Sequence, residues 1–174
     1  MIGTMNAGQQ QHIFEDWLAD HRGLFFKIVR AYAFTHHDQE DLFQVIATQV
    51  WNSVPNYRGE SKTSTWIYRV ALFAAISWSK KERKYRDHHR DVDASTPTLL
   101  AASPRQNPRV EWLYEKISQL DEIDRSLTLM MLDGFSYADI ATTLGISESH
   151  VGVKLNRLKK HLSNLSKEGT DDEI

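Results

Sequence analysis

Apolar residues in the first part of the chain recur every three or four positions, which is the spacing of one face of an α-helix. The members of this pattern are Phe14, Trp17, Leu18, Leu24, Phe25, Ile28, Val29 and Tyr32. Residues 1–11 are polar and rich in Gln, so we expect them to be frayed. The polar run His36-His37-Asp38 interrupts the pattern, and we expect the first helical stretch to end before it.

A second helix is predicted for residues 38–54, where apolar side chains from Leu42 to Val50 fall on successive turns. Asp38 can cap the first turn of this helix, because a short acidic side chain accepts a hydrogen bond from a free backbone N–H. Pro55 disfavours a helical conformation in the residue before it, so the helix should stop there.

A polar loop with the sequence NYRGESKTS follows, and then a third helix is predicted for residues 64–86. This helix begins with the apolar residues Trp66, Ile67 and Val70. It ends in a cluster of Lys and Arg, whose positive charge suits the C-terminus of a helix.

Residues 87–108 show no periodicity and contain three of the four prolines, so we interpret them as a flexible linker. Four further helical patterns follow, at residues 110–119, 121–133, 137–144 and 147–165, and we expect them to be shorter helices. No alternating pattern of useful length suggests a strand. The predicted fold is all-α, with two small helical domains joined by a flexible linker: residues 12–86, then 87–108, then 109–167.

The end of the second domain has the pattern of a helix-turn-helix. Gly145 can take the left-handed conformation that a tight turn needs, and Ser147 can cap the next helix. The small Ala141 would let the two helices cross closely, with apolar side chains such as Ile140 and Val151 between them. An ordinary helical hairpin is the alternative, but it requires neither this spacing nor a basic second helix.

The distribution of charge adds to this picture, although the net charge of the 174-residue chain is only −2. Residues 80–90 hold six basic and two acidic side chains, and residues 149–167 hold five basic and no acidic ones. An acidic stretch at 111–139 separates them. Two basic patches are typical of two contacts with a polyanion, and two solvated helix ends are the alternative.

Other features limit the function classes. The chain has no Cys, no apolar run long enough to span a membrane and no secretion signal at its start, which together favour the cytoplasm. The eight His residues include adjacent pairs, but no HExxH motif or Gly-rich phosphate loop is present. We therefore expect no enzymatic activity, no cofactor and no metal site.

Three stretches in this order resemble one protein family. HDQEDLFQVIATQVW resembles an acidic amphipathic helix, YRGESKTSTWIYRVALFAAISWSKKERK resembles the loop and basic helix of the same domain, and LDEIDRSLTLMMLDGFSYADIATTLGISESHVGVKLNRLKKHL resembles the second domain of extracytoplasmic-function (ECF) sigma factors. The similarity runs from about residue 14 to 165. It implies a dissociable subunit of bacterial RNA polymerase that directs initiation, with no chemistry of its own.

The resemblance also implies roles for individual residues. The second helix would dock on a coiled coil in the polymerase clamp through Glu40, Asp41, Leu42, Gln44 and Gln49. The loop and third helix would melt and read the minus-ten element of the promoter. The residues concerned are Asn56, Tyr57, Arg58, Gly59, Ser61, Lys62, Thr63, Ser64, Trp66, Lys80, Lys81, Arg83 and Lys84.

The second domain would read the minus-thirty-five element in the major groove of duplex DNA. The helix-turn-helix geometry places one set of side chains near base edges: Ser147, Glu148, Ser149, His150, Gly152, Val153 and Asn156. Lys154, Arg157 and Lys159 are better placed for phosphates.

Two stretches depart from the family pattern. Val45 stands where an acidic residue often follows Gln44, and Leu72-Phe73 is more apolar than the matching stretch in relatives. The apolar patch could pack on the second domain or on a regulator. An anti-sigma factor that hides both binding faces is a further expectation from the family. The rival interpretation is a stand-alone helix-turn-helix regulator that binds duplex DNA without polymerase.

Overall fold

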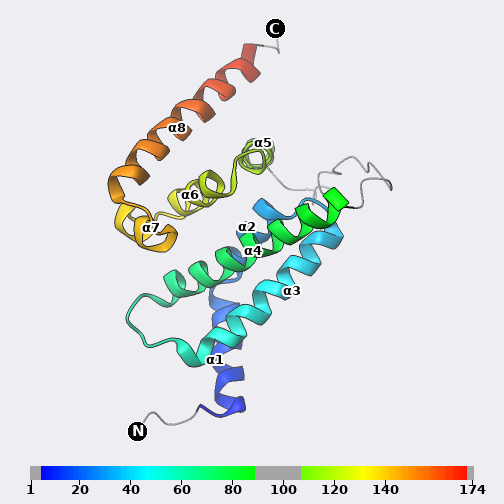
Figure 1. Cartoon of the computed structure of the whole chain (residues 1–174), viewed down its shortest axis with the longest axis vertical. Helices are drawn as coiled ribbons and strands as arrows, with labels where there is room; N and C mark the ends of the chain where they lie inside the picture. Colours follow the sequence, from blue (N-terminus) through cyan, green and yellow to red (C-terminus); the bar gives the residue numbers. More distant parts are fainter. Residues whose placement is uncertain (1–4, 89–106, 172–174) are drawn as a thin grey trace. The chain divides into compact units, whose positions relative to one another are not determined.

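The computed structural model describes residues 5–88 and 107–171 and divides the chain into two compact units, Met1–Arg105 and Gln106–Ile174 (Figure 1). All regular elements in the described residues are helical, as predicted. None of the helices in those two ranges has both the length and the apolarity that crossing a bilayer requires.

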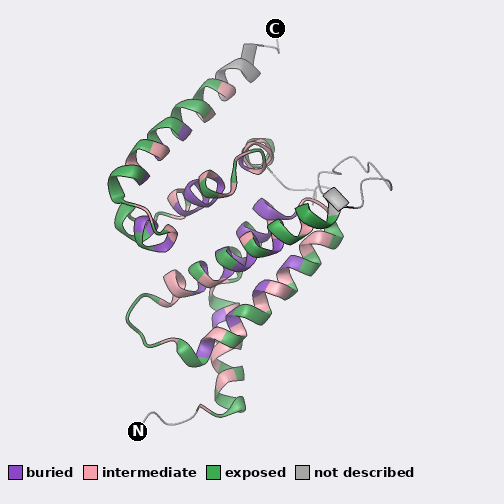
Figure 2. Cartoon of the chain, in the orientation of Figure 1, coloured by how far each residue is buried: buried purple, intermediate pink, exposed green. Residues whose placement is uncertain are grey.

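The described residues of unit 1 form four α-helices and one short 3₁₀ helix. These are α1 (Ala7–Asp20), α2 (Arg22–Tyr32), α3 (His36–Ser53), η1 (Val54–Asn56) and α4 (Thr63–His88). The core lies where α2, α3 and α4 pack together, and Figure 2 shows buried residues on the sides of these helices that face one another. Side chains with no exposed surface include Phe25, Ile28, Leu42, Ile46, Ile67 and Leu72.

The N-terminal helix begins earlier than predicted, because residues 7–11 are helical rather than frayed. Asn6 and Gln9 form a capping box, in which each side chain accepts a hydrogen bond from the backbone N–H of the other. The amide of Gln10 also donates to the carbonyl of Trp51 in α3, at 2.8 Å. A cap and one tertiary hydrogen bond therefore order a polar segment that has few apolar side chains to bury.

Helix α3 also begins earlier than predicted, at His36, and its cap is Thr35 rather than Asp38. The Thr35 hydroxyl accepts a hydrogen bond from the backbone N–H of Asp38 at 3.1 Å. The two histidines consequently lie inside the first turn instead of interrupting the helix. The helix ends at Ser53 and Pro55 lies in η1, in agreement with the predicted stop.

In unit 2, the part of the chain that the structure describes forms four helices. They are α5 (Pro108–Ser118), α6 (Glu122–Leu132), α7 (Tyr137–Leu144) and α8 (Glu148–Asp171). All four predicted helices are present, but α8 is 24 residues long and not short. The buried Arg125 joins the first two, because its guanidinium donates to the carbonyls of Ser118 and Leu120 at 2.6 and 2.9 Å.

The predicted linker, residues 87–108, lies mostly outside the described residues. The part that is described is helical at both margins: α4 continues to His88, and α5 starts at Pro108 after Asn107, whose side chain caps it.

Candidate nucleic-acid interface

The turn between α7 and α8 has the geometry that the sequence predicts. Gly145 has φ 69° and ψ 33°, a left-handed conformation in which glycine carries no Cβ penalty. The carbonyl of Ala141 accepts hydrogen bonds from the N–H groups of Gly145 and Ile146, at 2.9 and 3.1 Å. The Ser147 hydroxyl then accepts from the N–H of His150 at 3.2 Å and caps α8.

Apolar side chains fill the space between the helices of unit 2. Ile140, Val151 and Leu155 are fully buried, and Ala141 is nearly so. This packing fixes the direction of α8 relative to α7, so that the opposite side of α8 is held out towards solvent.

Most residues predicted to read or grip duplex DNA are exposed on α8 and its cap. The exposed members are Ser147, Glu148, Ser149, His150, Val153, Asn156, Arg157 and Lys159. We call these eight residues the α8 face. It combines short polar side chains, two cations and the half-exposed apolar Val153, which are the group types that contact base edges and phosphates in a major groove.

Gly152 and Lys154 are placed differently. Gly152 is half-buried beneath Tyr137 of α7, and a Cβ there would lie 3.6 Å from the tyrosine ring. The Lys154 Nζ donates to the carboxylate of Asp124 in α6 at 2.7 Å, and both side chains are about three-quarters buried. In this structure Lys154 therefore ties α8 to α6 and does not stand free on the α8 face.

In unit 1, the polar loop before α4 is organised by Tyr57. Its hydroxyl donates to the carbonyl of Ser61 at 2.7 Å and lies 3.2 Å from the hydroxyl of Thr63. The remaining predicted loop residues surround this tyrosine. Asn56, Arg58, Gly59, Ser61 and Lys62 are exposed, whereas Thr63 and Ser64 are half-buried.

The aromatic rings of unit 1 join the loop to the helices. The Tyr57 ring packs edge-on against Trp17 of α1, with centroids 5.3 Å apart, and lies 5.8 Å from Trp66 of α4. Trp66 is half-buried, and its indole N–H donates to the Ser53 hydroxyl at 3.1 Å. Trp66 is thus neither a core residue nor a free surface residue. Its contact with the Tyr57 ring connects the loop to α4.

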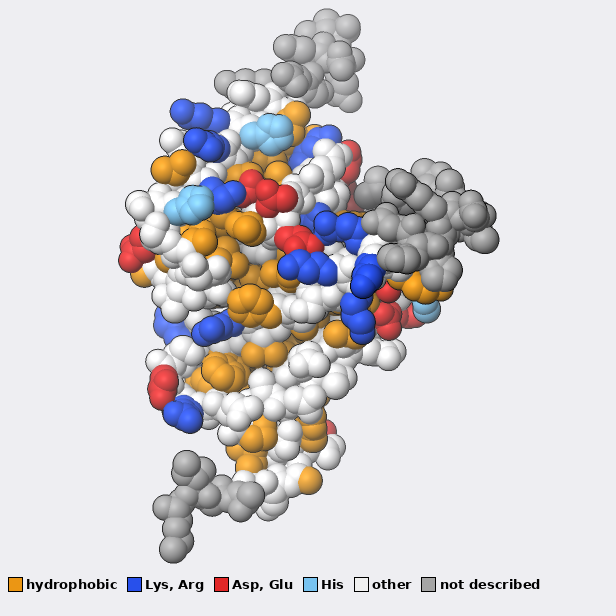
Figure 3. Space-filling view, in the orientation of Figure 1, with side chains coloured by type: hydrophobic (Ala, Val, Ile, Leu, Met, Phe, Trp, Pro, Cys, Tyr) orange, Lys and Arg blue, Asp and Glu red, His pale blue; other side chains and the backbone are white. Residues whose placement is uncertain are grey.

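The basic cluster lies at the end of α4. Lys80, Lys81, Arg83 and Lys84 are all exposed, and Figure 3 shows blue side chains gathered at the C-terminal end of this helix. Their exposure suits contacts with a phosphate backbone.

The residues predicted to bind polymerase do not share one surface of α3. Glu40 and Gln44 line a shallow hollow together with Phe26 and Phe43, whose rings stack with centroids 5.8 Å apart. Gln49 instead lines a groove against α4. The hollow and its aromatic pair were not predicted from the sequence, because Phe26, which is 50% exposed, lies outside the apolar pattern of its helix and meets Phe43 from another helix.

Two members of that predicted set have roles inside unit 1. Leu42 has no exposed surface, so its side chain belongs to the core and the expectation of a surface contact is wrong for it. The carboxylate of Asp41 accepts a hydrogen bond from the indole N–H of Trp78 at 2.7 Å, which connects α3 to α4.

The residues that depart from the family pattern differ in how far the structure buries them. Leu72 is fully buried, whereas Phe73 is 43% exposed. Val45 is half-buried and lines the same groove as Phe73. Of the Leu72-Phe73 pair, Phe73 therefore contributes an apolar surface, and Leu72 is an ordinary core residue.

Comparison with known families matches both units, in order. The family model for sigma-70 region 2 matches residues 17–85, and the model for sigma-70 region 4 matches residues 110–162. These two matches coincide with the bundle that carries the loop and α4 and with the unit that carries the helix-turn-helix.

Relatives and solved structures agree with this assignment. The chain is 29% identical over 150 residues to the ECF RNA polymerase sigma factor SigX of Bacillus subtilis, covering 78% of this chain and 76% of that protein. It is 25% identical to the ECF sigma-E factor of Escherichia coli K12 over 140 residues, or 73% of each chain.

Two solved structures share the fold. The sigma factor RpoE of Bartonella quintana, in complex with the anti-sigma factor NepR, superposes with a TM-score of 0.70 at 17% identity, covering 88% of this chain and 98% of that one. CnrH, in complex with the cytosolic domain of CnrY, superposes with a TM-score of 0.64 at 19% identity, covering 91% and 90%.

The fold and the two family matches define a helical transcription-initiation factor with one bundle of region 2 type and one helix-turn-helix unit. The chain belongs to the sigma-70 family, in its ECF group.

Proposed function

We propose that the chain is the promoter-recognising subunit of a bacterial RNA polymerase, acting in the cytoplasm and releasing core polymerase after initiation. The observation that supports this most is the pairing, on one chain, of a region 2 bundle with a helix-turn-helix whose α8 face is held towards solvent. A stand-alone regulator would need only the second of these units.

In this proposal α8 reads the minus-thirty-five element as duplex. Its early polar residues and Val153 approach base edges in the major groove, while Arg157 and Lys159 contact phosphates. The chain's net charge of −2 weakens the binding of free chain to DNA, so stable promoter binding requires the assembled polymerase.

Unit 1 acts on the minus-ten element. The loop around Tyr57 offers hydrogen-bonding and cationic groups next to the rings of Tyr57 and Trp66, and these groups suit the capture of an unstacked nucleotide. The basic end of α4 holds the phosphates of the opened strand.

The polymerase contact is centred on the hollow formed by Phe26, Phe43, Glu40 and Gln44. An exposed phenylalanine ring stacked on a half-buried one, beside an acidic side chain, suits a basic amphipathic helical partner such as the clamp coiled coil. An anti-sigma factor, of the kind present in the solved complex of RpoE with NepR, would control the chain by covering this hollow.

Run-off transcription with purified core polymerase tests the proposal. The DNA is the fragment upstream of the chain's own gene together with a library of genomic fragments. We expect initiation only when both chain and core polymerase are present. A chain that shifts DNA alone and leaves core polymerase inactive on every fragment would instead be a stand-alone regulator.

The polymerase contact has a separate test. Glu40→Lys places a cation in the hollow, and we expect it to weaken association with core polymerase at least tenfold in a fluorescence titration. Asp20→Lys is the matched control, because Asp20 is an exposed acid on α1 outside the hollow. Equal affinities for the two variants would move the contact elsewhere.

A further inference from the structure

The first half of α1 takes no part in the contacts proposed above. Residues 7–16 precede the stretch that the sigma-70 region 2 model matches, which begins at Trp17. These residues are mostly polar, yet they are helical, they follow a capping box, and two of their side chains contact α3. An ordered segment loses conformational entropy, which its contacts must offset.

One face of α1 carries three side chains that make contacts outside the helix. Gln10, Phe14 and Trp17 are spaced four and three residues apart, so they are neighbours along this face. The Gln10 amide donates to the carbonyl of Trp51 at 2.8 Å, and the Phe14 ring meets the Trp51 ring edge-on with centroids 5.5 Å apart. Trp17 packs edge-on against Tyr57. The face therefore joins the end of α3 to the tyrosine that organises the loop.

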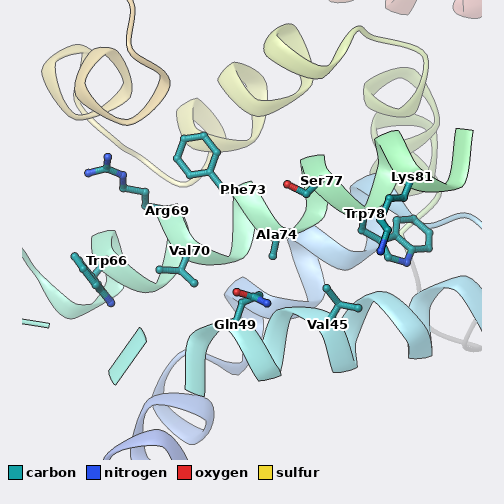
Figure 4. A pocket seen from close by; sticks show the side chains of 10 residues that line it. All are labelled: Val45, Gln49, Trp66, Arg69, Val70, Phe73, Ala74, Ser77, Trp78 and Lys81. Carbon is teal, nitrogen blue, oxygen red and sulfur yellow. The ribbon is translucent and has the colours of Figure 1, made fainter. Parts of the chain in front are cut away.

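These contacts lie where the loop begins. Helix α1 packs against α3 and against η1, which follows it (Figure 1). Two residues after Trp51, the Ser53 hydroxyl accepts a hydrogen bond from the indole of Trp66, which Figure 4 shows at the start of α4. The Tyr57 ring consequently has Trp17 of α1 and Trp66 of α4 as neighbours, with centroids 5.3 and 5.8 Å away. Fixing α1 on Trp51 fixes one of these two neighbours.

We propose that residues 7–16 position the loop for base recognition, because Gln10 and Phe14 fix α1 on α3 and so hold Trp17 against Tyr57. This inference rests on the proposed function and adds positioning residues to it. Groups that recognise a ligand must be held to within about 0.5 Å of their working geometry, since hydrogen bonds weaken steeply when their angles depart from linear. Loosening α1 therefore lowers the discrimination between bases at the loop.

The test uses holoenzyme assembled from core polymerase and the full chain, on a promoter from which the wild type initiates. Each base pair of the minus-ten element is substituted in turn. The initiation rate on the parent promoter, divided by the rate on the substituted promoter, is the discrimination ratio at that position. A specific contact gives a ratio of about 5- to 150-fold, and the position with the largest wild-type ratio is followed in the variants.

We expect Gln10→Ala to lower this ratio about 2- to 12-fold, the factor that one hydrogen bond contributes. Gln11→Ala is the matched control, because Gln11 is the next residue and its amide donates to Glu15 of the same helix at 2.9 Å. Its ratio should equal that of the wild type. Phe14→Ala should lower the ratio as Gln10→Ala does, whereas Phe14→Tyr keeps the ring and should stay within about 1.5-fold of the wild type.

A second control separates positioning from general stability. Ile46 is fully buried in α3 and has no part in the proposed DNA contacts. Ile46→Val shortens this side chain and destabilises the bundle, so its urea midpoint should fall while its discrimination ratio stays at the wild-type value. Association with core polymerase should be the same for all of these variants.

The outcomes distinguish this inference from the proposed function. If the wild type initiates and both Gln10→Ala and Phe14→Ala keep its ratio, α1 does not position the loop, although the proposed function stands. The inference is also wrong if Ile46→Val or Gln11→Ala lowers the ratio as much as Gln10→Ala. Should Phe14→Ala fail to fold, as circular dichroism would show, the two glutamine variants decide the question. If the wild-type holoenzyme initiates on no fragment, the proposed function fails and this inference fails with it.

Discussion

Lys154 either contacts DNA phosphates or ties α8 to α6, and its substitution distinguishes these two roles. The sequence places it among the phosphate-binding residues, but the structure pairs it with Asp124 across 30 residues of chain. Lys154→Gln should therefore loosen the contact between α8 and α6 and leave DNA phosphate contacts intact. Arg157→Gln, on an exposed side chain of the same helix, should have the opposite effects.

The size of the effect follows from the burial of the pair. Exposed ion pairs contribute about 0.2–1 kcal/mol, whereas hydrogen bonds to charged groups contribute about 1.5–3 kcal/mol. The two side chains here are 24% and 23% exposed and their atoms are 2.7 Å apart, which places the pair between these cases. We expect Lys154→Gln to cost about 1–2 kcal/mol, a factor of roughly 5–30 in the local opening equilibrium.

Native-state hydrogen exchange of the α8 amides measures this cost in the full chain. Protection should fall by that factor in Lys154→Gln, and adding Asp124→Asn to it should cost little more, because the contact is already lost. DNA binding at several salt concentrations gives the second readout. The slope should fall by about 0.9 in Arg157→Gln and stay unchanged in Lys154→Gln. A slope that falls equally in both variants, with α8 protection retained, would refute this reasoning and return Lys154 to the DNA surface.

Three further substitutions test other contacts. Gly145→Ala should destabilise the chain by about 1–2 kcal/mol because of its left-handed φ, while the control Gly23→Ala, in open helical space, should stabilise it by about 0.5–1 kcal/mol; equal urea midpoints would contradict this. Trp78→Phe removes the donor to Asp41 and should lower the free energy of unfolding by about 0.5–1.5 kcal/mol, seen as a lower urea midpoint. An unchanged midpoint would mean that the hydrogen bond is not stabilising. Tyr57→Phe removes the hydroxyl that holds the loop, so trypsin should cleave within residues 57–62 faster than in the wild type; an unchanged rate would show that the aromatic contacts alone order the loop.

The helices and the turn were predictable because each depends on local pattern. Apolar spacing located the helices of both units, and the combination of Ala141, Gly145 and Ser147 located the turn, since its geometry is set by residues close in sequence. The start of α1 was missed for the opposite reason: its order depends on a cap and on a hydrogen bond to Trp51, far along the chain.

The site was predictable in composition but not in detail. Sequence spacing indicated that Lys154 and Asp41 are polar helix residues, but not that Asp124 and Trp78 would engage them from other helices. Leu42 was assigned to the surface from a resemblance, although its place in the apolar pattern was the better guide to its burial. Contacts between residues far apart in the sequence, such as these two hydrogen bonds, are visible only in the three-dimensional structure.

Helix α7 is only eight residues long and lies between two left-handed glycines, Gly134 with φ 79° and Gly145 with φ 69°. A peptide of two turns does not hold helical structure alone in water. Helix α7 is therefore stabilised by the turns at its ends and by contacts with neighbouring helices. We expect its amides to exchange soonest among the helices of its unit, opening together as one cooperative segment. The orientation of the recognition helix α8 on DNA would then depend on α7, the helix of its unit that opens most readily.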